Sequence, residues 1–208
     1  MPTRPGKVLY TVACGGYVAG QLADFIRGRQ ADGWDVCVIA TPAAVKFMDT
    51  ASLSSLTGHV VRYEHKQPDE PDVLPRADAV TVVPATFNTI NKWAHGISDT
   101  LALGILHEAI GEGLPMVAVP TPNAALGRHP VFVASVATLR TWGVDVVFDP
   151  ENYPLPAPGT GSSAADFFPW EALEAAMERM HDQRRPRGGG PGGLREVVQG
   201  DPPTGGPP

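Results

Sequence analysis

The sequence predicts an α/β fold: a Rossmann-like, three-layer α/β/α domain around a parallel sheet, with a disordered C-terminal tail. Short apolar runs of strand length alternate with segments of helical spacing from residue 8 to residue 148. The 208 residues suffice for one domain with a substantial core. From Pro186 onward Gly and Pro make up most of the chain, which leaves almost nothing to bury. We therefore expect a single domain at 1–182 and a tail at 183–208.

The expected elements follow one another as strand, helix, strand along the chain. Strands are predicted at 8–13, 36–39, 79–83, 116–119 and 144–148, with 60–61 as a further candidate. Helices are predicted at 18–30, 41–48, 51–56, 100–110, 131–142 and 169–180. We expect Thr50 to cap the helix at 51–56 and Pro84 to end the central strand. Such alternation requires right-handed crossovers, so helices should cover both faces of the sheet.

Composition limits the classes of protein that the chain can represent. A net charge of -6 argues against general nucleic-acid binding, which normally needs a basic face. Cys14 and Cys37 give no disulfide framework, which fits a reducing cytosol. No run approaches the length of about 20 apolar residues that a membrane span needs. We expect a cytoplasmic protein with no membrane association and no metal site.

Polar and glycine residues follow three of the expected strands. Gly15 and Gly16 follow the first, and glycines there let a phosphate approach the backbone. Thr86, Asn88 and Thr89 surround the helix start after the central strand, where free N–H groups attract anions. The second strand ends at Thr41 and lacks the carboxylate that dinucleotide sites place there to bind a ribose. These features favour FMN over NAD.

The stretch from Pro84 to Asp99 resembles a known signature. Pro84-Ala85-Thr86-Phe87-Asn88-Thr89, followed by Gly96-Ile97-Ser98-Asp99, is similar to the Pro-Ala-Ser-Ala-Asn-Thr motif of the flavin-dependent cysteine decarboxylases. That family includes phosphopantothenoylcysteine decarboxylase and the lantibiotic peptidyl-cysteine decarboxylases, with flavin prenyltransferases as more distant relatives. The resemblance covers roughly residues 7–148 and implies FMN at a subunit interface of a homotrimer or an assembly of trimers. The cofactor-binding residues that it implies are Gly15, Gly16, Thr41, Ala85, Thr86, Asn88 and Thr89, with Phe47 near the flavin ring.

The implied catalytic residues depart from the family pattern. Asn123 matches an Asn that binds the substrate carboxylate in the family, although it could simply cap the next helix. Pro122, Leu126 and Gly127 replace two Met and a Trp of the same motif, so the substrate clamp has been rebuilt. The family's catalytic His aligns with Glu70, and His65 lies five residues earlier. Either is a candidate for handling a proton.

The resemblance implies oxidative decarboxylation of a cysteine-type carboxylate, which can be the C-terminal Cys of a peptide. In phosphopantothenoylcysteine decarboxylases a Cys in a lid after the last strand carries a reductive step. The corresponding segment here, 148–169, contains no Cys, so the product should remain an ene-thiol. Two alternatives stay open. One is a divergent flavin enzyme, either an oxidoreductase or prenyltransferase-like, and the other is a non-catalytic flavin-binding regulatory subunit.

Overall fold

Five parallel strands form a single sheet in the computed structural model, which describes residues 6–71, 73–161 and 165–183. The strand order is β2-β1-β3-β4-β5, and every neighbouring pair runs parallel. The strands are β1 (Lys7–Ala13), β2 (Trp34–Ala40), β3 (Ala79–Ala85), β4 (Met116–Pro120) and β5 (Asp145–Val146). The predicted fold class is confirmed. The predicted tail lies outside the described residues from position 184.

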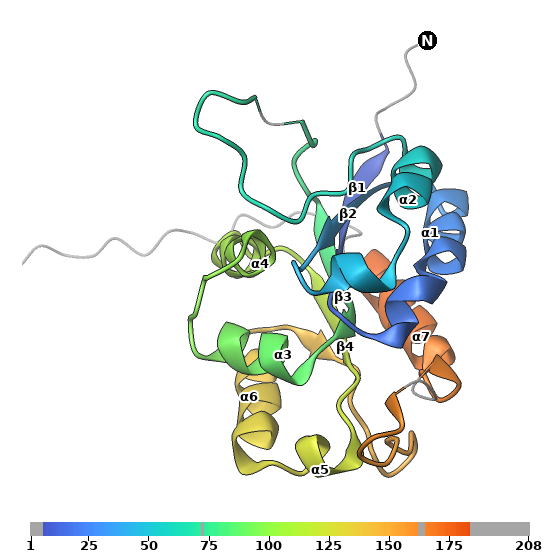
Figure 1. Cartoon of the computed structure of the whole chain (residues 1–208), viewed down its shortest axis with the longest axis vertical. Coiled ribbons are helices and arrows are strands. Elements are labelled where there is room, and N and C mark those ends of the chain that lie inside the picture. The colour runs from blue at the N-terminus through green and yellow to red at the C-terminus, as the bar shows by residue number, and fades with distance from the viewer. Residues whose placement is uncertain (1–5, 72, 162–164, 184–208) are drawn as a thin grey trace, which may run out of the picture.

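Helices cover both faces of this sheet and make it the middle layer of three (Figure 1). One face carries α1 (Leu22–Ala31), α2 (Thr50–Thr57) and α7 (Trp170–Gln183). The other carries α3 (Phe87–Ala94), α4 (Leu101–Gly111) and α6 (Pro130–Thr141). Each face is packed by its own cluster of buried apolar side chains, because successive residues of a strand point to opposite faces. In β1, for example, Leu9 faces α1 and Val12 faces α3.

The last helix packs against the body of the domain. Leu173 on α7 is fully buried among the side chains of α1 and the sheet. Arg29 on α1, which is also buried, pairs with Glu174 on α7, and Arg179 pairs with Asp145 at the edge of the sheet at 2.7 Å. These contacts join α7 to both α1 and β5.

Several boundaries differ from those predicted. The expected helix at 18–30 begins as a 3₁₀ turn, η1 (Tyr17–Gln21), and the one at 41–48 shortens to η2 (Ala44–Phe47). The cap of α2 is Asp49 and not Thr50, because the Asp49 carboxylate accepts hydrogen bonds from the N–H groups of Ala51 and Ser52. In place of a strand at 60–61, Arg62 makes an isolated bridge to Ile39.

Pro84 does not end the central strand. β3 continues to Ala85, because the two carbonyl groups at its end still find donors on the residues that directly follow β1 and β4. The carbonyl of Pro84 accepts from the N–H of Cys14 at 3.0 Å, and that of Ala85 accepts from the N–H of Thr121 at 2.9 Å. A proline removes a donor from the ladder but leaves its acceptor in place, which explains the difference.

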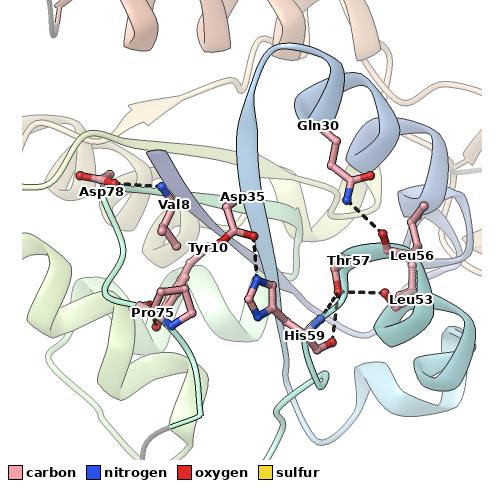
Figure 2. Close-up of polar contacts among 10 residues, drawn as sticks. All are labelled: Val8, Tyr10, Gln30, Asp35, Leu53, Leu56, Thr57, His59, Pro75 and Asp78. Carbon is pink, nitrogen blue, oxygen red and sulfur yellow. Dashed lines mark hydrogen bonds and ion pairs between the residues drawn. The ribbon is translucent and has the colours of Figure 1, made fainter. Parts of the chain in front are cut away.

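The segment 63–76 extends away from the body beyond α4 (Figure 1, teal). Figure 2 shows how its ends are fixed. Tyr10 donates its hydroxyl proton to the carbonyl of Pro75 at 2.7 Å, and the N–H of Val8 donates to Asp78 at 2.9 Å. At the other end His59 pairs with Asp35 on β2 at 2.7 Å. None of the helices in the described ranges is both long and apolar enough to cross a membrane.

Candidate functional site

The strand order reverses at β1, and we refer to the region outside the carboxyl ends of β1 and β3 as the crevice. From β1 the chain continues outward to β2 on one side, whereas β3 and β4 lie on the other side. In open parallel sheets ligands bind at such a switch point, outside the carboxyl ends of the strands. Backbone hydrogen bonds hold the strand-end loops together: Thr41 N–H to Ala13 O at 2.8 Å, Cys14 N–H to Pro84 O at 3.0 Å, and Thr121 N–H to Ala85 O at 2.9 Å.

The two glycines after β1 have different surroundings. A Cβ added to Gly15 would lie 3.1 Å from the Cβ of Ala43 and 3.3 Å from its carbonyl oxygen. Gly15 therefore lets the first loop pack closely against the loop after β2. A Cβ at Gly16 would meet only Pro84, at 3.9 Å, so the space beside this residue is open toward the crevice. Gly16 thus leaves the backbone accessible, as a phosphate site requires.

The start of α3 presents polar groups to the same crevice. The Thr86 hydroxyl caps the helix by accepting a hydrogen bond from the N–H of Thr89 at 3.3 Å. The two hydroxyl oxygens also lie 3.0 Å apart. Ala85 is buried just before the cap, Thr86 is partly buried and Asn88 is exposed on the first turn. The first N–H groups of the helix and the positive end of its dipole favour an anion here.

Cys14 joins this group, and analysis of the sequence did not single it out for the site. It is 1% exposed, and its thiol lies 3.2 Å from the Thr89 hydroxyl. Burial raises the pKa of the Cys14 thiol, and hydrogen bonds with Thr89 and Thr86 oppose that shift only in part. The residue therefore stays a neutral thiol. A Cys immediately after an apolar strand, one position before a glycine turn, is the only sequence signal that could have drawn attention to it.

The segment after β2 contributes Thr41 and Phe47, and Phe47 contacts Tyr17 on η1. Thr41 is 9% exposed, and its backbone carbonyl accepts from the N–H of Ala44 at the start of η2. Phe47, the residue predicted to lie near a flavin ring, packs edge-on against Tyr17 with their ring centroids 5.7 Å apart. Both rings are exposed in part, Phe47 by 37% and Tyr17 by 55%. Both rings are therefore partly open to solvent.

Asn123 caps the short helix α5 (Ala124–Gly127), as the alternative reading of the sequence allows. Its carboxamide oxygen accepts hydrogen bonds from the N–H groups of Ala125 at 3.1 Å and Leu126 at 3.0 Å. A carboxamide also carries an NH₂ group with two donors, which capping does not use. Capping and binding of a carboxylate are therefore compatible in one side chain.

The segment after β5 folds back onto α5. The N–H of Ala124 donates to the carbonyl of Pro156 at 2.8 Å. A Cβ at Gly127 would collide with the Leu155 side chain, and Phe148 and Pro122 would both lie 3.5 Å from it. The glycine that departs from the family motif is thus the residue that admits Leu155 beside α5.

His65 and Glu70 both lie on the 63–76 segment and are exposed. They line a shallow hollow formed by residues 60–73 alone. The Glu70 carboxylate accepts a hydrogen bond from the N–H of Gln67 at 3.0 Å. Solvent surrounds the Glu70 side chain, and the structure places no buried pocket around it in the described part of this chain. The structure thus brings together Gly15, Gly16, Thr41, Ala85, Thr86, Asn88 and Thr89, with Asn123 on the next loop, but leaves His65 and Glu70 on a separate segment.

A parallel sheet covered by helices on both faces, with small and hydroxyl residues after its strands, places the chain in the Rossmann-like class of α/β proteins. Within that class, the Flavoprotein family model matches residues 6–180, and the chain belongs to this family.

Named relatives include decarboxylases. A probable phosphopantothenoylcysteine decarboxylase of Streptococcus mutans is 26% identical over 184 residues, which cover 85% of this chain and 98% of that protein. The coenzyme A biosynthesis bifunctional protein CoaBC of Mycobacterium tuberculosis is 30% identical over 162 residues, or 76% of this chain and 38% of that protein. The chain therefore spans well under half of the bifunctional relative. The crystal structure of the FMN-dependent cysteine decarboxylase SpaF matches with a TM-score of 0.61 and 24% identity, covering 82% of this chain and 97% of that one.

The close contact at Gly15 gives a stability prediction. We expect Gly15→Ala to lower the free energy of unfolding by about 1–3 kcal/mol, because the added methyl group overpacks against Ala43. Gly28→Ala is the matched control, since nothing lies within 4 Å of a Cβ at that position in α1. It should raise the free energy of unfolding by about 0.5–1 kcal/mol, the usual gain in a helix interior. Urea unfolding of the two variants measures both effects, and equal behaviour would contradict the close packing.

Proposed function

We propose that the chain binds FMN in the crevice between β1 and β3 and oxidatively decarboxylates a cysteine-type carboxylate to an ene-thiol. The observation that carries the proposal is the meeting, at one sheet edge, of an open glycine loop, a threonine-capped helix start and an asparagine with spare donors. The named relatives favour the same chemistry. A peptide with a C-terminal Cys is the substrate that we would test first.

The residues of the crevice fit a flavin mononucleotide. Open space beside Gly16 and the free N–H groups at the start of α3 suit a phosphate. Thr41 and Thr86 add hydroxyl groups for the phosphate or the ribityl chain, and Phe47 with Tyr17 offers an aromatic face for the ring. Bound FMN would supply the oxidising equivalents, which no protein side chain provides. The protein would bind the substrate carboxylate through the Asn123 NH₂ group and hold the carbon next to sulfur against the cofactor.

The direct test is an absorbance spectrum of the purified protein, followed by incubation with short peptides that end in Cys. We expect a flavin band and a mass decrease of about 46 Da, the sum of CO₂ and two hydrogen atoms. Peptides ending in Ser should remain unchanged, because they lack the sulfur next to which the proposed oxidation takes place. A flavin band without a mass change would favour the divergent flavin enzyme or the regulatory subunit. A protein that neither carries nor takes up FMN would overturn the cofactor proposal.

The two roles of Asn123 can be separated by substitution. Asn123→Asp keeps an oxygen for the N–H groups of Ala125 and Leu126 but replaces the NH₂ donors with a negative charge. We expect unchanged thermal stability and a KM raised by at least about tenfold, since the charge repels a substrate carboxylate. Asn123→Ala removes the cap as well and should also lower the melting temperature. An unchanged KM in the Asp variant would exclude Asn123 from carboxylate binding.

The isolated position of His65 and Glu70 supports a site shared between copies of the chain. The 63–76 segment extends away from its own body, so we propose that in a homotrimer it reaches the crevice of a neighbouring copy (Figure 1). Co-expression of Asn123→Ala with the double variant His65→Ala, Glu70→Ala tests this. Each variant alone should be inactive, and random mixing at equal amounts should restore about a quarter of the sites. No recovery in proven mixed oligomers would mean that neither residue acts across an interface.

A further inference from the structure

We propose that Cys14 is a positioning residue for the flavin site: its thiol sets the direction of a hydrogen-bond chain through Thr89 to Thr86, so that the Thr86 hydroxyl proton points into the crevice. This inference rests on the proposed binding of FMN. It assigns a role to a buried thiol that the proposed chemistry does not otherwise use.

The three side chains form a continuous chain at the switch point. The Cys14 sulfur lies 3.2 Å from the Thr89 hydroxyl oxygen, which lies 3.0 Å from the Thr86 hydroxyl oxygen. Cys14 follows β1 and the threonines follow β3. These hydrogen bonds therefore link the residues after the two strands that border the crevice. Cys14 and Thr89 are 1% and 5% exposed, so water does not compete for these bonds.

The number of protons on the three side chains sets the direction of this hydrogen-bond chain. A hydroxyl has one proton to donate and two lone pairs to accept with. If the Cys14 thiol donates to Thr89, the Thr89 hydroxyl is free to donate to Thr86. The Thr86 oxygen then accepts twice, from the hydroxyl and from the backbone N–H of Thr89. Its own proton is consequently left for a ligand.

The opposite direction would use the Thr86 proton internally. Thr86 would donate to Thr89, and Thr89 would donate to the Cys14 sulfur, which is a weak acceptor. Burial keeps the thiol protonated, and its sulfur lies at hydrogen-bond distance from the Thr89 hydroxyl, so the thiol is better suited to donate in this contact than to accept. The first direction is therefore favoured. It makes Thr86 a donor toward an acceptor-only ligand group, such as a phosphate oxygen or a flavin carbonyl.

The experiment measures FMN affinity by quenching of flavin fluorescence, with no need for turnover. We expect Cys14→Ala to weaken FMN binding about tenfold, because the Thr86 proton can turn back into the protein. Cys14→Ser keeps a donor at the same place and should bind within about twofold of the unaltered protein. In a Thr86→Val background the Cys14→Ala change should have no further effect, because the donor that it orients is gone.

Cys37→Ala is the matched control for loss of a buried thiol. Cys37 is fully buried on β2, and burial, with the nearby Asp35 charge, raises its pKa to about 12. We expect this variant to lose stability, as Cys14→Ala does, but to keep its FMN affinity. Equal affinity for Cys14→Ala and Cys37→Ala would overturn the inference, and so would a Ser variant as weak as the Ala variant. If the unaltered protein binds no FMN at all, the proposed function itself fails.

Discussion

The pairing of β1 with β3 is the contact on which the rest of the molecule depends. These neighbours lie side by side although 65 residues separate the end of β1 at Ala13 from the start of β3 at Ala79, and they divide the sheet into the half that leads to β2 and the half that leads to β4. The buried hydroxyls of Thr11 and Thr81 meet at 3.3 Å on directly paired positions in its interior. Because all strands are parallel, this one pairing brings the loops after β1 and β3 to the same edge, and the crevice follows from it.

The polar groups of the crevice serve the fold before they serve any ligand. Thr86 caps α3 and Asn123 caps α5, each with one oxygen. In both residues the remaining donor is left unused by the cap. Helix caps at the carboxyl edge of a sheet are therefore well suited to become binding groups, since the cap fixes the side chain and does not use its donor. Fixing these side chains during folding reduces the entropy lost when a ligand binds.

Much of this arrangement could be predicted from the sequence, because apolar strand runs and the residues after them are local signals. The central strand and the polar start of α3 were both predicted for that reason. The Pro84 boundary was wrong, because a local rule for proline does not see carbonyls that pair with the residues after β1 and β4. The thiol of Cys14 looks like any small core residue until β3 is placed beside it. No local sequence pattern determines where the 63–76 segment places Glu70, because a segment of this length can follow many paths.

The contact between Gly127 and Leu155 has an evolutionary consequence. A side chain at position 127 would occupy the space of the Leu155 side chain. The next residue, Pro156, accepts a hydrogen bond from the N–H of Ala124, the first residue of α5. A side chain at 127 therefore requires Leu155 to move or to become smaller while the chain keeps this course. Homologues that carry a bulky residue at 127 should therefore have a small residue, a deletion or a different path at 155. Covariation between these positions would divide the family into two structural lineages that a search for the threonine motif alone would merge.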